Sequence, residues 1–378
     1  MGLIGLIGPI MLACSSSEDL PQQQVAIEVA ASVGQYDGAV TSGSATRSWT
    51  PPDGYHTYSS LYGGESYVNP ARLEQSTIDV FFTQGTTATL HGKLNYSTAT
   101  EKWKFITKVD PNSISSGDYF AYGYIPREAA DSATITTLPA STYAGGAVLT
   151  IHGLKSVATD PCVIIGAKQG TDQNTCTGLQ AGDFEFNLRT GESATNYLYF
   201  LFDHLYSALS ISMRVDAEYY SLRRIKLKEL YLKTETTSGT TPEKTDVTIT
   251  LVKNDEGTTP ISTITYTPSE DDTKCDSTVY RDKDGFPLLT TYSTFMGHFM
   301  PQNVSKLIVT SVYDVYDTDG NLIRKNCKAT NTMPLSELFN LQNESKRGWK
   351  YTVNMTIKPT YLYMLSEPDL DSPGMTVE

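Results

Sequence analysis

The sequence predicts an all-β fold, arranged as two β-sandwich domains in tandem. Tyrosine and threonine are abundant, with 24 Tyr in 378 residues, and both residue types pack well in strands. Short runs of alternating apolar and polar residues are separated by Gly, Pro and Asp, at intervals typical of sandwiches and barrels. No long segment keeps a helical period of apolar residues. The length of the chain favours two domains over one.

The chain begins with an apolar run, Leu3 to Ala13, which stops at Cys14 and is followed by polar residues. A small residue before a cysteine at the end of such a run resembles a bacterial lipoprotein signal, in which the peptide is removed and the cysteine receives lipid. We therefore expect residues 1–14 to be a signal ending at the lipidated Cys14, which would anchor the exported chain to the outer membrane. The run is shorter than the roughly 20 residues that a transmembrane helix needs.

The first predicted strand follows a polar tether, residues 15–24. Apolar side chains recur at every second position of residues 25–33, which predicts a half-buried strand. These side chains are Val25, Ile27, Val29, Ala31 and Val33. Residues 34–54 are rich in Gly, Ser, Thr and Pro, so we expect an exposed loop there, and this loop carries Arg47 followed by Ser48.

Further strands are expected along the first half of the chain, each bounded by turn residues. They fall at 78–83, 87–95, 102–109, 118–125, 147–153, 162–168, 183–188, 196–203, 208–216 and 225–233. We place the N-terminal domain at residues 25–235. Residues 236–243 are rich in Thr and Ser and are the predicted linker.

The C-terminal domain is expected over residues 244–378. An Asp-Gly pair in the turn 317–320 predicts a hairpin, because this pair is favoured in tight turns, and a second hairpin turn is expected at 254–257. The flanking and following strands are expected at 246–253, 261–267, 306–316, 321–329 and 349–357. One short helix is expected at 334–341, with Pro334 near its start.

Four cysteines remain after Cys14, and two of them fall in each predicted half. This distribution suggests two disulfides of an exported protein, Cys162–Cys176 and Cys275–Cys327. Reduced, buried thiols are the alternative. The sequence has no CxxC and no paired His spacing, so we expect no zinc site.

Charge and motif content argue against several functions. A net charge of −13 disfavours nucleic acid as a partner, because such binding needs clustered Lys and Arg. The sequence lacks phosphate-loop, nucleophile-elbow and metalloprotease motifs. Asp203 and His204 are neighbours, but adjacent side chains of a strand face opposite ways, so we do not expect them to act together. Aspartate-rich turns at 282–285 and 317–320 lack the ligand register of a calcium loop. We expect a non-enzymatic protein with no catalytic residue, metal or cofactor.

Several segments together resemble the fimbrillin family, the exported type V pilins of Bacteroidales. The most specific segment runs from Trp349 to Asp371 and is similar to the C-terminal strands of fimbrillin-like proteins. The segments 119–126, 203–206 and 223–228 also fit. The similarity extends over most of the chain after the signal, and it concerns the fold more than any active site.

The resemblance implies two transthyretin-like, Greek-key β-sandwich domains and export as a lipoprotein. It also implies cleavage after an arginine in the loop behind the first strand, followed by polymerisation through strand exchange. Arg47, with Ser48 after it, matches such a site, and Arg72 and Arg127 are further trypsin-like positions. The implied function is a structural fimbrial subunit or a fimbria-associated adhesin at the cell surface, with other fimbrial subunits as partners.

The predicted first strand explains why cleavage would matter. Loss of residues 25–47 would leave an apolar groove bordered by unpaired backbone groups, which an extended segment of another subunit could fill. The C-terminal segment 350–366 offers two candidate donors with alternating apolar side chains, either Tyr351, Val353, Met355 and Ile357, or Tyr361, Tyr363 and Leu365. Alternatively, both are closing strands of the second sandwich.

A second hypothesis is a surface glycan-binding lipoprotein of a nutrient uptake system. Lipidation, the acidic composition, β-sandwiches and abundant Tyr suit this function, because aromatic faces stack on sugar rings. Host or bacterial surface glycans or proteins would be the partners. Trp49, Trp103 and Trp349 are the candidate contacts. Packing in the core is the alternative for each tryptophan.

Overall fold

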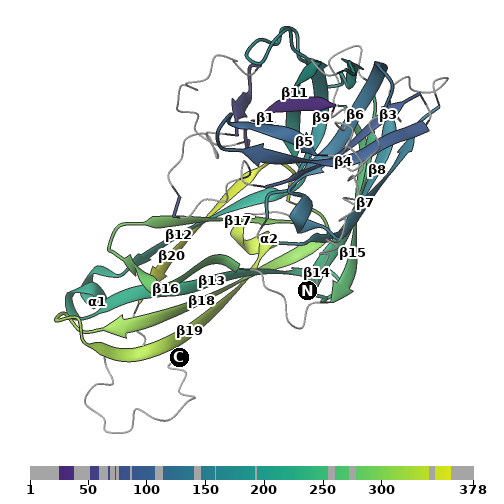
Figure 1. Ribbon diagram of the computed structural model, residues 1–378. Coiled ribbons are helices and arrows are strands. Elements are labelled where there is room, and N and C mark those ends of the chain that lie inside the picture. The colour runs from purple at the N-terminus through teal and green to yellow at the C-terminus, as the bar shows by residue number, and fades with distance from the viewer. Residues whose placement is uncertain are drawn as a thin grey trace, which may run out of the picture.

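The computed structural model is an all-β protein, which confirms the predicted class. It describes residues 25–37, 52–58, 67–68, 73, 76–85, 87–106, 114–139, 146–157, 159–191, 194–253, 260–271, 278–339 and 345–358. The strands form two bodies, joined along one side by a further sheet (Figure 1).

The N-terminal body is a nine-stranded sheet. Its members are β1 (Ala26–Gly34), β2 (Tyr55–Thr57), β3 (Ile78–Gln84), β4 (Thr87–Ser97), β5 (Lys102–Ile106), β6 (Gly117–Ile125), β9 (Cys162–Gln169), β10 (Glu185–Leu188) and β11 (Thr195–His204). The strand order is β10-β6-β3-β4-β5-β1-β11-β9, and β2 pairs with β1. Because β9 also pairs with β6, at Tyr124–Val163 and Ile125–Cys162, the sheet closes on itself into a ring.

The inside of this ring is filled by a first hydrophobic core, rich in aromatic side chains. On β11, Phe200 and Phe202 face this core, whereas Tyr199 and Leu201 face a second core on the outside of the ring. The strand is therefore buried on both faces, which explains why its sequence is a continuous apolar run and not a simple alternation.

The C-terminal body consists of two sheets that share one core. Its strands are β12 (Ser207–Val215), β13 (Arg224–Thr236), β16 (Thr278–Leu288), β17 (Ser293–Phe299), β18 (Val304–Tyr316), β19 (Leu322–Pro334) and β20 (Lys350–Ile357). One sheet has the order β17-β12-β20 and the other the order β16-β13-β18-β19. Ile211 of the first sheet and Leu230 of the second lie in the same core, as expected where two sheets pack face to face.

A bridging sheet joins strands from both halves of the sequence. It contains β7 (Ser132–Thr137), β8 (Ala147–Lys155), β14 (Pro242–Leu251) and β15 (Ile261–Asp271), in the order β15-β14-β8-β7. Leu149 and Ile249 of this sheet belong to the same core as Tyr124 and Leu201 on the outside of the ring. The second core is therefore continuous from the N-terminal body, through the bridging sheet, into the C-terminal body.

The predicted boundary between the domains is wrong. Residues 236–243 are not a linker, because they contain the end of β13, a tight turn and the start of β14. The turn is fixed by its hydroxyl groups, with Thr236 Oγ1 lying 2.7 Å from Thr240 Oγ1 and 2.8 Å from Ser238 Oγ. In addition, β12 and β13 pair with strands of the second half, whereas β14 pairs with β8 of the first half. The sheets therefore change between β11 and β12.

Helical segments are short among the described residues. They are a 3-10 turn (η4, Arg127–Ala129), α1 (Ala217–Leu222) and α2 (Leu335–Leu338). The helix expected at 334–341 is thus shorter than predicted. The side chain of Asp216 caps α1, accepting hydrogen bonds from the backbone of Glu218 and Tyr219. Within the described part of the chain, the structure contains no helix long and apolar enough to cross a membrane.

We predict that Gly123→Ala destabilises the ring. Gly123 of β6 lies opposite Val80 of β3, and a Cβ atom at this position would come within 2.1 Å of the Asp79 carbonyl oxygen. The two backbones would have to separate, so the free energy of unfolding should fall by about 3 kcal/mol. Urea unfolding would measure this change. Gly34→Ala is the matched control, because its Cβ would meet no atom closer than 3.7 Å. An equal loss in both variants would contradict the close approach of β3 and β6.

Candidate functional site: the first strand and the network at its end

The first strand is buried in the N-terminal body, as the sequence predicts. Its alternate apolar side chains all lie in the first core: Val25, Ile27, Val29, Ala31 and Val33. The opposite face is also largely covered, because Ser32 is fully buried and Ala30 packs in the second core. Glu28 on that face pairs with Lys104 of β5, with 3.2 Å between Oε1 and Nζ. The expected half-buried strand is therefore more deeply buried than its alternation suggests.

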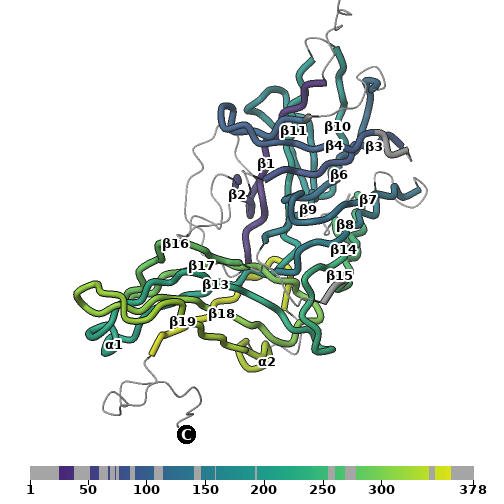
Figure 2. Tube along the Cα trace, turned by 60° about the horizontal axis from the view of Figure 1, so that its bottom comes forward, coloured from purple at the N-terminus to yellow at the C-terminus, as the bar shows by residue number. Residues whose placement is uncertain are grey.

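The two neighbours of β1 hold it to different extents. On one side, residues Ala26 to Val33 pair in parallel with Thr195 to Phe202 of β11. On the other side, β5 pairs only at Glu28 and Val29, and β2 pairs near the end of β1. In Figure 2, β1 runs along the N-terminal body toward the strands of the C-terminal body. The strand is a member of the ring, and its removal would open the sheet between β5 and β11.

Both ends of β1 are fixed by hydrogen bonds from other strands. At the start, Asn196 Nδ2 donates to the carbonyl of Ala26 at 3.2 Å. At the end, His204 Nε2 donates to the carbonyl of Gly34 at 2.8 Å. The backbone of Asp37 then bridges to Trp349, next to β20, and its N–H donates to the Gly348 carbonyl at 2.9 Å. The segment after β1 thus contacts the segment before β20.

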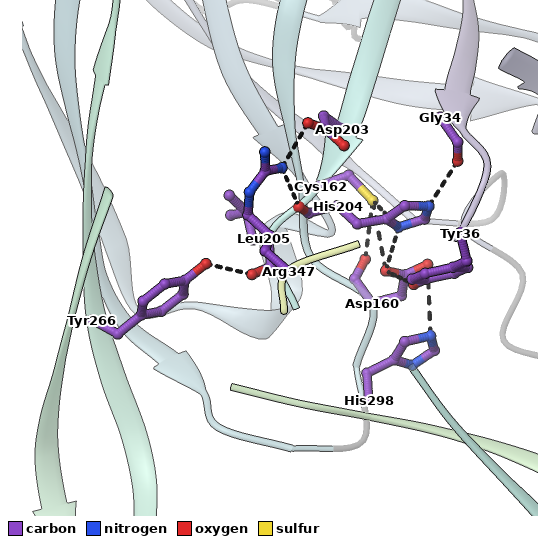
Figure 3. A network of polar contacts seen from close by, with 10 residues as sticks. All are labelled: Gly34, Tyr36, Asp160, Cys162, Asp203, His204, Leu205, Tyr266, His298 and Arg347. Atoms are coloured by element: carbon purple, nitrogen blue, oxygen red, sulfur yellow. Dashed lines mark hydrogen bonds and ion pairs between the residues drawn. The ribbon is translucent and has the colours of Figure 1, made fainter. Parts of the chain in front are cut away.

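A buried polar network lies where β1 ends (Figure 3). Asp160 is at its centre, because its Oδ1 accepts from the Tyr36 hydroxyl at 2.7 Å and lies 2.9 Å from His204 Nδ1. The Tyr36 ring stacks on His204, with 3.7 Å between the ring centroids. The Cys162 thiol sulfur lies 3.4 Å from His204 Nδ1, and His298 Nε2 of β17 lies 3.8 Å from Asp160 Oδ2. The network therefore joins the segment after β1 to β9 and β11 of the N-terminal body and to β17 of the C-terminal body.

Burial and mutual contact set the charges of this network. Burial alone would raise the pKa of Asp160, but the imidazoles of His204 and His298 hold the pKa of that carboxyl well below its usual range. Burial would lower the pKa of His204, but Asp160 raises it above its ordinary value instead. Asp160 and His204 are thus a buried ion pair. Burial, with Asp160 nearby, raises the pKa of the Cys162 thiol, so this thiol keeps its proton.

Asp203 and His204 face different partners, which confirms that these adjacent side chains of the strand point in different directions. Arg347 Nη1 donates to Asp203 Oδ2 at 2.6 Å and to the carbonyl of His204 at 2.7 Å. The His204 ring points the other way, into the buried network. Asp203 and Arg347 therefore attach the turn before β20 to the end of β11.

The predicted processing sites lie outside the described residues. These are Cys14, Arg47 and Ser48, together with the signal 1–14 and the tether 15–24. After β1, the described residues end at Asp37 and resume at Pro52, so Arg47 falls in the intervening segment. Lipidation at Cys14 and cleavage at Arg47 remain predictions.

The first candidate donor is a strand of the C-terminal body. Residues Lys350 to Ile357 form β20, which pairs in parallel with β12 and lies at the edge of its sheet. Tyr351 and Val353 are buried in the second core, and Met355 and Ile357 are partly buried against it. In this structure β20 is therefore a closing strand of the C-terminal body, which is the alternative interpretation of this segment. Tyr361, Tyr363 and Leu365 lie outside the described residues.

The predicted Cys162–Cys176 disulfide is wrong, because both thiols are free. Cys162 is the first residue of β9, and Cys176 follows the other end of that strand. Eight strand residues at about 3.3 Å each keep the two Cα atoms far beyond the roughly 7 Å that a disulfide tolerates. Cys327 on β19 is free as well, and its expected partner Cys275 lies outside the described residues.

The three tryptophans have different surroundings. Trp103 is fully buried in the first core, and its indole N–H donates to the Ser76 carbonyl at 3.0 Å. It is therefore a core residue, and its proposed contact with glycans is wrong. Trp349 is 38% exposed, with Lys346 Nζ 4.7 Å from its ring centroid. Trp49 lies outside the described residues.

Sequence reasoning missed Tyr36, Asp160 and His298 as members of the buried network. They are distant from one another in sequence and come together only because β9, β11 and β17 meet beside the end of β1. The strand β17 was itself missed, as were β2, β7 and β16. A histidine at the end of an otherwise apolar strand, His204, was the one sequence signal for a buried polar site.

Comparison with known proteins gives only distant similarity. No family model matches the sequence, and no curated protein matches it. Solved structures similar to this chain include fimbrial proteins and candidate adhesins of Bacteroides and Porphyromonas.

One of these structures is a candidate cell adhesion protein from Bacteroides uniformis, with 12% identity and a TM-score of 0.37, covering 88% of this chain and 94% of that one. Another is a fimbrial protein from Bacteroides vulgatus, with 12% identity and a TM-score of 0.31, covering 75% and 89%. A third is the fimbrial anchor protein Mfa2 from Porphyromonas gingivalis, with 11% identity and a TM-score of 0.25, covering 87% and 90%.

We predict that His56 makes the site sensitive to acid. His56 of β2 pairs with Val33, and burial, followed by the charge of His204, lowers the pKa of His56 to about 4. The unfolded histidine titrates near 6.5, so between about 6.5 and about 4 only the unfolded chain gains this proton. The free energy of unfolding should therefore decrease as the pH is lowered through this range, by up to about 3 kcal/mol.

Urea unfolding of the wild type and of His56→Gln, at neutral pH and at pH 4.5, would measure this contribution. The variant should lose less stability on acidification than the wild type. His152→Gln is the control, because the His152 side chain is 39% exposed on the bridging sheet. The same pH dependence in His56→Gln and in the wild type would contradict the prediction.

Proposed function

We propose that this chain is a structural fimbrial subunit, or a fimbria-associated adhesin, that polymerises by strand exchange. It is exported as a lipoprotein anchored through Cys14, cleaved between Arg47 and Ser48, and built into a filament at the cell surface. Its two bodies correspond in this proposal to the transthyretin-like, Greek-key domains that the family resemblance implies. Neighbouring fimbrial subunits are its partners.

The observation that carries the proposal is the placement of β1. This strand fills the ring with five alternate side chains, and the chain then enters the segment that contains Arg47. Cleavage there would separate residues 25–47 covalently from the rest of the molecule. The released piece would be a complete strand, so a different strand could take its place without any change in the rest of the ring.

The groove left by β1 would be apolar and would present unpaired backbone groups. Burial of a large apolar side chain contributes roughly 1.5–3 kcal/mol, so Val25, Ile27, Val29 and Val33 together represent several kcal/mol that an open groove would lose. Along one edge, β11 would expose the backbone groups that now pair with Ala26 to Val33. Both terms favour refilling of the groove by an extended apolar segment, with β11 setting its register.

Two segments remain as donors in this proposal. The first is β20, which pairs with one strand only and could leave its sheet edge at the smallest cost in backbone hydrogen bonds. The second is the segment with Tyr361, Tyr363 and Leu365, which follows β20 directly. Using the second segment would leave Tyr351 and Val353 in the core, so it requires less rearrangement of the C-terminal body.

Glycan binding is the second candidate function, and one observation favours it. Trp349 is exposed beside Lys346, a combination of an aromatic face and a cation that can contact a sugar. The proposal gives this surface no part in assembly. Saccharide affinity gels that retard the protein but not Trp349→Ala, together with an absence of filaments, would favour this second function.

We predict that Arg47→Ala blocks maturation. The mature surface form should begin at Ser48, and the variant should instead keep residues 25–47 and stay monomeric, because β1 would continue to fill the ring. Mass spectrometry of surface protein and SDS-resistant ladders on gels would measure both effects. Arg72→Ala is the control and should mature normally. A wild-type filament whose subunits begin at Cys14 would contradict the cleavage step.

A second prediction separates the two donors. Deletion of residues 359–378 removes Tyr361, Tyr363 and Leu365 and leaves β20 in place. If the following segment is the donor, the SDS-resistant ladder should disappear while the monomer keeps its thermal unfolding midpoint. A ladder that persists in this deletion but is lost in Val353→Asp would identify β20 as the donor. A ladder that survives both changes would rule out C-terminal strand exchange.

A further inference from the structure

A set of metal-ligand side chains is fully buried beside the end of β1 (Figure 3). It contains a carboxylate oxygen of Asp160, the thiol sulfur of Cys162 and an imidazole nitrogen of His204, all within 4.8 Å of one another. Cys162 and His204 lie opposite each other on the paired strands β9 and β11, and Asp160 is in the loop just before β9. The proposed strand exchange gives these three side chains no role.

The separations between the ligand atoms are close to those of a tetrahedral metal site. Cys162 Sγ lies 3.4 Å from His204 Nδ1 and 3.7 Å from Asp160 Oδ1, and Nδ1 lies 2.9 Å from Oδ1. Zinc bonds of about 2.0–2.3 Å place neighbouring ligand atoms about 3.3–3.6 Å apart. Only the separation between Nδ1 and Oδ1 has to open, by about 0.4 Å, to admit the ion.

The orientation of His204 also fits a ligand. A backbone carbonyl can only accept, so the 2.8 Å contact with Gly34 places a hydrogen on His204 Nε2. Nδ1 is therefore the nitrogen directed at Asp160 and Cys162. A backbone carbonyl that accepts from the far ring nitrogen is the usual support of a metal-bound histidine. The Tyr36 hydroxyl donates to Asp160 Oδ1, the ligand oxygen itself, at 2.7 Å and so holds the carboxylate in its orientation toward His204 and Cys162.

We propose that Asp160, Cys162 and His204 bind a divalent zinc ion in the N-terminal body. A thiolate, an imidazole and a carboxylate form a ligand set that suits zinc. On binding, bonds from the metal to Sγ, Nδ1 and Oδ1 replace bonds to water in the hydrated ion, and two protons leave to solvent, one from the thiol and one from the imidazolium. One retained water would complete the tetrahedron. The two negative charges of the thiolate and carboxylate then balance the charge of the ion.

The zinc site goes beyond the proposed function and is independent of it. All three ligands follow Arg47 in the sequence, so the site would remain in the chain after cleavage. Of the described residues 25–37, Gly34 contacts the site through its carbonyl, and Tyr36 contacts it through its hydroxyl and through its ring, which stacks on His204. Metal binding can therefore be tested on the uncut full chain, and its outcome does not depend on polymerisation.

Cobalt is the probe, because Co²⁺ bound to a thiolate gives an intense near-ultraviolet charge-transfer band and visible d–d bands. The protein is the full chain in which the other cysteines are replaced by serine, so that Cys162 is the only thiol. These replacements are Cys14→Ser, Cys176→Ser, Cys275→Ser and Cys327→Ser. We expect both sets of bands to saturate at one equivalent of Co²⁺ and to disappear when Zn²⁺ is added. Zn²⁺ should also raise the thermal unfolding midpoint, and a chelator should reverse this rise.

Two further variants assign the ligands. Adding Cys162→Ser to this protein should abolish the charge-transfer band, and His204→Gln should shift cobalt binding to much higher concentrations. Circular dichroism of each variant without metal establishes that it is folded. If Cys162→Ser does not fold, the presence or absence of the charge-transfer band in the single-thiol protein tests the proposal without this variant. A folded single-thiol protein without a charge-transfer band, or a band that survives Cys162→Ser, would overturn the proposal.

Discussion

The parallel pairing of β1 with β11 is the interaction on which the rest of the structure depends. Because β9 also pairs with β6, the N-terminal sheet closes into a ring only when β1 bridges β5 and β11. The side chains that β1 contributes then complete a core that contains Trp103 and Phe202. A strand near the start of the chain thus closes a sheet whose other members end some 170 residues later, as the hydrogen bond between Gly34 and His204 illustrates.

The end of β1 also connects the two bodies. Tyr36 reaches Asp160, and Asp37 pairs with Trp349 immediately before β20. On the far side, Arg347 holds Asp203 of β11. Release of residues 25–47 would remove the first two of these contacts and leave the third. Strand exchange in the N-terminal body would therefore also change the surroundings of the segment that leads to the candidate donors.

The sequence predicted individual strands better than it predicted the domain boundary or the buried polar network. The alternation over residues 25–33 predicted β1, because one periodic pattern of apolar side chains reports burial directly. The domain boundary was misplaced because the polar residues 236–243 have the composition of a linker, although their hydroxyls bond to one another in a turn. The buried network could not be predicted, since Tyr36, Asp160 and His204 are brought together only by the pairing of β1, β9 and β11.

A structure of the assembled filament, determined by electron cryomicroscopy, tests the central claim most directly. The account predicts that the position between β5 and β11 is occupied by a C-terminal segment of the neighbouring subunit, with apolar side chains at every second position inside the ring. Residues 25–47 of the same subunit should be absent from this position. A filament in which each ring still contains its own β1, from Ala26 to Gly34, would contradict the account.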